Sequence, residues 1–240
     1  MKLIKIFIAL VLVTGAGQTF ANANVNSNEI QDRHLTGFHA VDVSGSFNVY
    51  ITQGATESVK VEAPANIIRH IATEVRGGTL NIFSKDHFSW GNLFGGGNRK
   101  IVIYVTIKDV NSIALTGSGD VFFKEGVNAN TLRLALTGSG DINGKINVKT
   151  LVSDITGSGD IKVWGRADNS KISVTGSGDY SGRDLVTVNA VAHVGGSGDA
   201  SVNVNGNLEA SVTGSGDVHY SGNPKSVSKS KTGSGSIEKN

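Results

Sequence analysis

Hydrophobic and polar residues alternate along the second half of the chain in a pattern that repeats. Each copy has two aliphatic positions separated by one residue, followed by a corner of the form Thr-Gly-Ser-Gly-Asp. Because side chains alternate between the two faces of a strand, this spacing predicts β-strands with one buried face. The residues directly before six of the corners are Leu115, Leu136, Ile155, Val174, Val194 and Val212.

The corner recurs at a nearly constant interval. Its first glycine lies at positions 117, 138, 157, 176, 196, 214 and 233, so the steps are 21, 19, 19, 20, 18 and 19 residues. A fixed period of this length is typical of a solenoid. Because the periods carry strand alternation and glycine suits a sharp turn, we predict an all-β fold: a parallel β-helix with coils of about 19 residues.

Residues 33–110 precede the repeats and have strand-like segments without this period. We predict strands over residues 40–43, 47–52, 58–63, 71–75, 79–84 and 100–107, and one helical turn within 64–70. Gly45-Ser46-Phe47 resembles a diverged corner. We therefore expect residues 33–110 to cap the N-terminal end of a rod formed by residues 111–240.

The first 23 residues are typical of a secretory signal peptide. Lys2 and Lys5 precede an apolar run over residues 6–13, and Ala21-Asn22-Ala23 provides small residues for cleavage. The run is shorter than the roughly 18 residues that span a bilayer, so we expect no stable membrane insertion after cleavage. We predict export to the periplasm, the outer-membrane surface or the medium, with residues 24–32 as a flexible leader.

The charge balance of the exported part bears on its partners. The chain has 22 Lys and Arg, two of them in the signal peptide, and 20 Asp and Glu, so the remainder carries 20 of each sign. A formally neutral chain has no electrostatic basis for nucleic-acid binding. The absence of cysteine excludes disulfides and thiolate metal sites.

The last residue of the corner forms a predicted column of carboxylates. Neighbouring unit charges about 4.8 Å apart repel by roughly 0.9 kcal/mol in water and about 3–4 kcal/mol at an effective dielectric of 20. We interpret these residues as a structural turn ladder, whose carboxylates accept hydrogen bonds from turn N–H groups, and we expect no cofactor. Bound Ca²⁺ is the alternative, although residues 195–199 do not match the calcium pattern Gly-Gly-x-Gly-x-Asp. The ladder comprises Asp120, Asp141, Asp160, Asp179, Asp199 and Asp217.

An insertion over residues 86–98 holds three large aromatic residues: Phe88, Trp90 and Phe94. One interpretation is that they cover the end of the core. The other is that they form an exposed loop that contacts a sugar, lipid or protein, because aromatic side chains dominate interface energetics. We take these three as candidate partner-binding residues.

Several segments together resemble a known family. They are Arg33, Gly37-Phe38, the block from Val43 to Gly54, the block from Val105 to Lys108 and the first corner from Leu115 to Val121. They resemble the head GIN domain family of putative autotransporter adhesins over residues 33–240. The resemblance implies a right-handed β-helix, exported to the envelope of a Gram-negative bacterium, with a role in surface adhesion and no catalytic residues.

We accordingly predict an exported, non-enzymatic adhesin or envelope-interaction module that binds a surface glycan or protein. The alternative is a carbohydrate-binding or polysaccharide-degrading β-helix protein. The two differ in whether purified protein cleaves acidic polysaccharides.

Overall fold

The structure, a computed structural model, describes residues 28–85 and 101–240. The predicted signal peptide and the residues Phe88, Trp90 and Phe94 lie outside this range. One 3₁₀ turn, η1 (Ile68–His70), accompanies the strands. The strands are β1 (Asn28–Asp32), β2 (Ala40–Gly45), β3 (Asn48–Gln53), β4 (Ser58–Pro64), β5 (Ile71–Arg76), β6 (Thr79–Ser84), β7 (Val102–Ile107), β8 (Ser112–Gly117), β9 (Asp120–Gly138), β10 (Asp141–Gly157), β11 (Ile161–Gly176), β12 (Tyr180–Gly196), β13 (Ala200–Val204), β14 (Asn207–Gly214), β15 (Val218–Ser221), β16 (Ser226–Gly233) and β17 (Ile237–Lys239).

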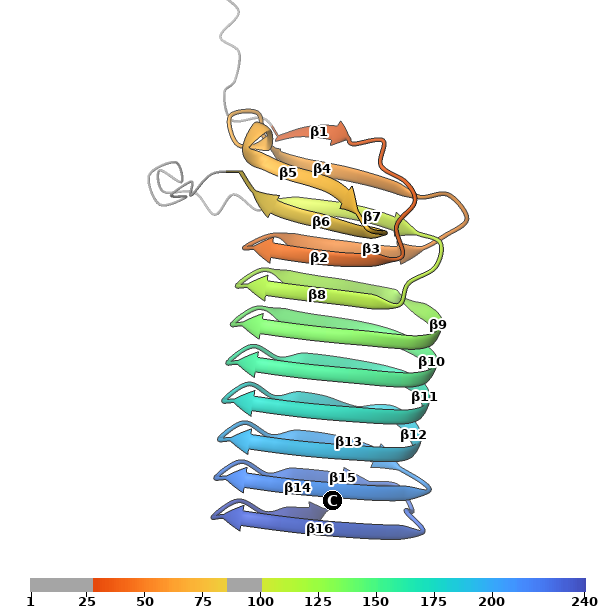
Figure 1. Cartoon of the computed structure of the whole chain (residues 1–240), viewed down its shortest axis with the longest axis vertical. Coiled ribbons are helices and arrows are strands. Elements are labelled where there is room, and N and C mark those ends of the chain that lie inside the picture. Colours follow the sequence, from red (N-terminus) through yellow and green to blue (C-terminus); the bar gives the residue numbers. More distant parts are fainter. Residues whose placement is uncertain (1–27, 86–100) are drawn as a thin grey trace, which may run out of the picture.

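The strands wind into a rod of about seven turns with coils of about 19 residues, which confirms the predicted β-helix. In Figure 1 the near strands run to the left and the chain returns behind them to the right. It then comes round the right-hand bend to the front one level lower, so the coil is right-handed. Parallel pairing joins each coil to the next, as in β10 and β11, where Ile142 pairs with Ile161 and Gly157 with Gly176. Within the described part of the chain, no segment forms an apolar helix of membrane-spanning length.

The strands of the middle coils are long and include a bend. β9 to β12 each run for 16 to 19 residues and continue round the bend opposite the corner. Ladder pairing between coils persists through that bend, because each backbone group finds its partner one coil away. Inward positions such as Ile142, Ile146 and Leu151 are buried and form one continuous core.

The corners stack in one column, as predicted. The first glycine of each corner has a positive φ, +126° at Gly157, which a residue with a side chain rarely adopts. The second glycine is required for a different reason: a Cβ at Gly159 would overlap the carbonyl oxygen of Gly140 in the preceding coil. Two glycines per corner therefore allow neighbouring coils to approach within hydrogen-bonding distance.

The first coil of the stack comes from a distant part of the sequence. β2 and β3 flank the diverged corner at Gly45 and pair in parallel with β8 and β9, with Gly45 opposite Gly117. On their other side β2 pairs with β6 and β3 with β7. β6 ends and β7 begins level with the two sides of the Gly45 corner, since Ser44 pairs with Phe83 and Asn48 with Val102.

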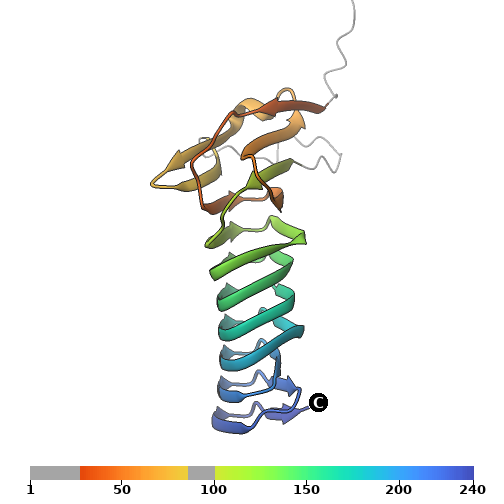
Figure 2. The same ribbon diagram turned by 90° about the vertical axis from the view of Figure 1, so that its right-hand side faces the viewer.

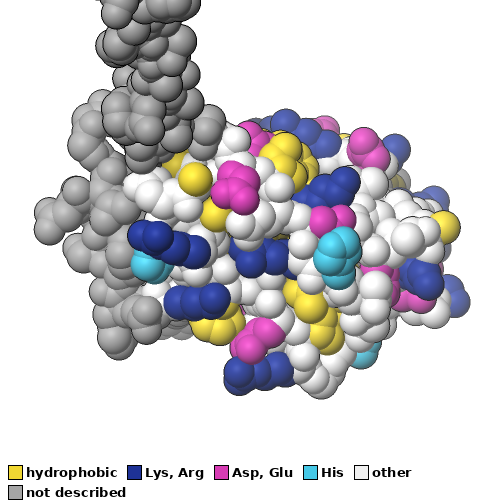
Figure 3. All heavy atoms as spheres, turned by 90° about the horizontal axis from the view of Figure 1, so that it is seen from above, with side chains coloured by type: hydrophobic (Ala, Val, Ile, Leu, Met, Phe, Trp, Pro, Cys, Tyr) yellow, Lys and Arg dark blue, Asp and Glu magenta, His cyan; other side chains and the backbone are white. Residues whose placement is uncertain are grey.

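The N-terminal end of the rod is closed by antiparallel strands. β4 pairs with β7 and β1, and β5 pairs with β6 in a hairpin that projects sideways from the rod (Figure 2). η1 confirms the predicted helical turn, and Ile67, Ile68 and Ile71 around it are buried over the end of the core. Acidic and basic side chains are interspersed on this end (Figure 3).

Residues 28–32 differ from the flexible leader that the sequence suggested. They form β1, which pairs antiparallel with β4 from Asn28 opposite Pro64 to Asp32 opposite Lys60. The physical reason is that β4 has a free edge, whose N–H and C=O groups accept one further strand.

Lysine residues close the C-terminal end of the rod. Lys229 and Lys231 are exposed and pair with the buried residues Ala210 and Val212 of the coil above, so they stand at repeat positions where that coil has core residues. Lys229 Nζ donates to the carbonyl oxygen of Ile237, 2.8 Å away, and lies 4.9 Å from the centre of the Tyr220 ring. The last coil thus covers the apolar interior with long polar side chains, as expected of a terminal repeat.

Candidate functional site

The aspartates of the corners lie in one column, and their carboxylates bind the backbone of the neighbouring coil. The N–H of Asp179 donates to Asp160 Oδ1 at 2.8 Å, and the N–H of Asp199 donates to Asp179 Oδ1 at 2.8 Å. The same contact links Asp141 to the N–H of Asp160, Asp199 to that of Asp217 and Asp217 to that of Ser236. The sequence suggested capping of the turn, and the acceptor in fact serves the next turn along the rod.

These bonds explain how like charges can stack. A hydrogen bond from a backbone N–H favours the ionised carboxylate, which offsets repulsion between coils. At the end of the column, hydrogen bonds from the backbone N–H of Ser236 and, to a smaller extent, from its hydroxyl lower the pKa of Asp217. The charges of His219 and Lys231 lower this pKa further, whereas burial raises it. Because the folded-state pKa lies below the unfolded value, ionised Asp217 favours folding at neutral pH, and this contribution is lost as the pH falls below about 4.

A hollow of about 340 Å³ lies beside the column. Its lining includes the corner residues Asp141, Asp160, Asp179 and Asp199. Ser181, Ser201 and Arg183 also line it, and Arg183 Nε donates to Ser201 Oγ at 3.2 Å. Lys162 and His219 also line it. The hollow therefore combines carboxylate acceptors with guanidinium, ammonium and hydroxyl donors.

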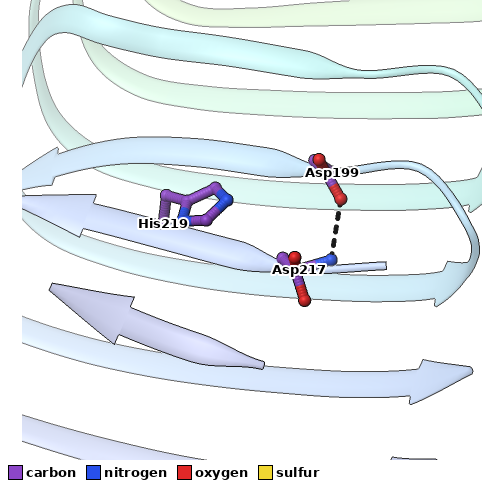
Figure 4. A group of neighbouring side chains, drawn as sticks. All are labelled: Asp199, Asp217 and His219. Atoms are coloured by element: carbon purple, nitrogen blue, oxygen red, sulfur yellow. Dashed lines mark hydrogen bonds between the residues drawn. The ribbon is translucent and has the colours of Figure 1, made fainter. Parts of the chain in front are cut away.

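Asp199, Asp217 and His219 bring three ligand atoms within 4.8 Å of one another (Figure 4). In Figure 4 the His219 ring points toward the two carboxylates, and one oxygen of Asp199 already accepts the N–H of Asp217. Ca²⁺ takes six to eight oxygen ligands. Two carboxylates and an imidazole are a poorer match for Ca²⁺ than for a transition metal. Cation binding at the column stays a prediction for the chelator experiment below.

A second column, of asparagine side chains, was missed in the sequence. Asn189 Nδ2 donates to Asn169 Oδ1 at 3.0 Å, and Asn207 Nδ2 donates to Asn189 Oδ1 at 2.9 Å. Ser226 continues the column by donating to Asn207 Oδ1. The signal was available, because these positions are 20, 18 and 19 residues apart, but asparagine elsewhere in the chain obscures it.

Three aromatic rings stack on the outer face of β3, β7 and β9. The Tyr50 ring centre lies 5.8 Å from that of Tyr104 and 5.1 Å from that of Phe122. Tyr50 and Tyr104 are 38% and 43% exposed, and Lys124 Nζ lies 5.4 Å from the Phe122 ring centre. The aromatic residues predicted as partner-binding, Phe88, Trp90 and Phe94, lie outside the described residues, so their role stays a prediction.

The arrangement of coils and corners matches a known family. The model of the family described as putative auto-transporter adhesin, head GIN domain, matches residues 37–224. The chain belongs to this family. A search of curated proteins finds no match.

Solved structures share this head GIN fold. A putative adhesin from Bacteroides fragilis NCTC 9343 has a TM-score of 0.83 and 24% identity, covering 90% of this chain and 98% of its own. A putative lipid binding protein from Parabacteroides distasonis ATCC 8503 has a TM-score of 0.71 and 26% identity, covering 90% and 97%. A putative adhesin from Parabacteroides merdae ATCC 43184 has a TM-score of 0.69 and 18% identity, covering 90% and 97%. The fold is therefore shared.

We expect the aspartate column of this head GIN domain to be structural. Asp160→Ala removes the acceptor of the Asp179 N–H and should cost about 1 kcal/mol, or about 2–4 °C in melting temperature. Asp160→Asn keeps an oxygen acceptor and lowers the repulsion between coils, so it should cost little. Thermal unfolding with and without chelator checks both, and chelator should leave the melting temperature unchanged. A rise of several degrees in millimolar Ca²⁺ that Asp160→Asn abolishes would instead establish a cation site.

Proposed function

We propose that this protein is an exported, non-enzymatic rod that acts as an adhesin or envelope-interaction module and binds a surface glycan or protein. Membership of the head GIN family supports a role in adhesion. The signal-peptide pattern of residues 1–23 supports export. Cell fractionation, with N-terminal sequencing to detect cleavage after Ala23, tests the export step.

The observation that carries the proposal is the regular surface of the rod. From β8 to β17 each coil places its corner under the previous one, and hydrogen-bonded columns of Asp and Asn side chains run along the outside. Stacked repeats hold such groups at fixed spacing, which suits an extended partner that contacts several coils at once.

The same regularity favours binding over catalysis. A lyase acting on an acidic polysaccharide clusters acidic residues for a cation at one position, whereas here the aspartates recur at every corner from Asp120 to Asp217. In each of Asp160, Asp179 and Asp199, one carboxylate oxygen accepts a hydrogen bond from the backbone N–H of the next coil. A carboxylate that accepts a backbone N–H is a weaker base, which supports a non-enzymatic role.

Carbohydrate binding is the second candidate, favoured by the hollow beside the aspartate column. Most small-molecule sites are lined mainly by hydrophobic residues. This hollow is lined instead by carboxylates, hydroxyls and Arg183. Polar groups that both donate and accept match the hydroxyls of a sugar.

Attachment of beads coated with the exported protein to bacterial or host cells tests the proposal. We expect coated beads to attach and the protein to leave acidic polysaccharides uncleaved. Attachment equal to that of uncoated beads would contradict the adhesive role, and release of unsaturated sugar products would identify a lyase.

The triple substitution of Phe88, Trp90 and Phe94 by Ala tests where the partner binds. If these side chains contact the partner, attachment falls while the melting temperature stays the same, because aromatic side chains contribute most to contact energy. Tyr104→Ala, which removes an exposed aromatic side chain from β7, is the matched control. A drop of many degrees in the triple variant would show that the aromatics cover the core.

A further inference from the structure

The hollow beside the aspartate column exists because two side chains are small. In the column two residues after each aspartate, the ladder register aligns Asn143 with Lys162, Lys162 with Ser181, Ser181 with Ser201 and Ser201 with His219. The two serines are the smallest residues of this column. The long side chains of Lys162 and His219 therefore bound a gap that is two coils high.

The polar groups around this gap have unused bonding capacity. Asp160, Asp179 and Asp199 each use Oδ1 for a backbone N–H, and within residues 28–85 and 101–240 their Oδ2 atoms have no hydrogen-bond partner. A carboxylate oxygen without a protein partner can accept a hydrogen bond from a bound molecule or from water.

Arg183 adds a feature that the repeat does not require. Its Nε donates to the hydroxyl of Ser201, which is 6% exposed. Tyr180 and Gly182 are buried, so Asp179, Ser181 and Arg183 point outward in turn and Ser181 lies between the carboxylate and the guanidinium. A guanidinium held in this way keeps further N–H donors for a ligand oxygen.

The charge of the lining restricts the ligand. Four aspartates face two permanent cations, Lys162 and Arg183, so the lining carries an excess of two negative charges when His219 is neutral. A carboxylated or sulfated sugar would meet repulsion, whereas a neutral hydroxyl can donate to Oδ2 and accept from Arg183. The volume of about 340 Å³ lies at the lower end of the range of small-molecule sites, which suits one or two sugar rings.

We propose that this hollow, bounded by Lys162, Ser181, Ser201, His219 and the aspartate column, is a binding subsite for a neutral saccharide. The inference rests on the proposed adhesive function and names the ligand class of one site on the rod. The sugar hydroxyls take the place of water on the free carboxylate oxygens, and Arg183 orients the ring.

Ser181→Lys is the decisive variant, because it fills the hollow with a side chain that the same column already carries at Lys162. Ser173→Lys is the matched control: it makes the same change on the other face of the rod, in a column that already accommodates His193. Equal melting temperatures of the three proteins would show that the fold is intact.

The exported protein and both variants are applied to a printed array of neutral hexose and N-acetylhexosamine oligomers and of uronic-acid and sulfated oligomers. We expect wild type and Ser173→Lys to bind neutral oligomers, and Ser181→Lys to lose at least about tenfold in binding. Asp179→Asn, which keeps an oxygen for the N–H of Asp199, should bind acidic oligomers better than wild type does.

The inference is overturned if Ser181→Lys binds like wild type, if acidic oligomers are preferred, or if wild type binds no glycan. The bead assay separates these failures from failure of the proposed function. Attachment of wild-type beads without glycan binding would keep the adhesive role and remove this subsite. Absence of both attachment and glycan binding would remove both.

Discussion

Replacing Gly159 by Ala should destabilise the protein by about 3 kcal/mol or more, which corresponds to a drop of about 6–12 °C in melting temperature. The second glycine of the corner lies directly against the coil above, and an added Cβ would overlap the carbonyl oxygen of Gly140. That oxygen belongs to backbone, so the overlap can be relieved only by separating two coils. Separation would weaken the bond from the Asp160 N–H to Asp141 and the neighbouring ladder.

Gly195→Ala is the matched control, because Gly195 stands where the other corners have Thr. A Cβ at this position would have its nearest neighbour, the carbonyl oxygen of Val174, at an ordinary 3.7 Å. The substitution should change stability by less than about 0.5 kcal/mol, with a slight gain from the restricted unfolded chain. Thermal or denaturant unfolding of both variants checks the difference. Equal losses would show that the glycines contribute through general backbone flexibility and not through close approach.

Phe123→Ala should cost about 3–5 kcal/mol, since it removes a fully buried ring from the centre of the rod. The ring occupies the space that Gly144 leaves in the next coil, where a Cβ would overlap Cδ2 of Phe123. Phe122→Ala, one residue earlier and facing outward against Tyr50, should cost only about 1 kcal/mol. Denaturant unfolding of the two variants measures the contrast.

Gly144→Val provides a stricter test of this packing. Gly144 pairs with Val163 in the following coil, so valine is the residue that the repeat uses at this position. In the wild-type background the substitution should destabilise strongly, because it clashes with Phe123. In the Phe123→Ala background it should restore part of the lost stability by filling the cavity. Additive effects of the two substitutions would contradict direct packing between these positions.

The fold of the repeat part was predictable from the chain itself. Each coil has the same three features in the sequence: a first glycine, aliphatic residues before the corner and a period near 19 residues. Every coil therefore repeats the same local conformation. The strand predictions before the repeats also lie close to the observed elements: residues 79–84 coincide with β6, and residues 58–63 fall within β4. Alternation of buried and exposed side chains is a local property, so it can be read along the chain.

The placement of β2 and β3 in the stack could not be predicted by the same reasoning. They stack between β6 and β7 on one side and β8 and β9 on the other, although about 60 residues separate them from β8. Gly45 indicated a corner in the sequence. The position of that corner in the stack depends on which strand edges β2 and β3 meet after the chain has folded. β1 likewise became a strand only because β4 offered an edge.

From the sequence alone, the coil, its corner and the carboxylate column could be inferred, because a repeated local pattern must produce a repeated structure. The tertiary structure decided what those groups contact: Asp160 caps the next coil, Asn169 and Asn189 form a second column, and Ser181 and Ser201 leave a hollow between two long side chains. Each of these contacts joins residues 18 to 20 positions apart across one step of the rod. Their geometry depends on how side chains of neighbouring coils lie against one another, and that information is not present in any single coil.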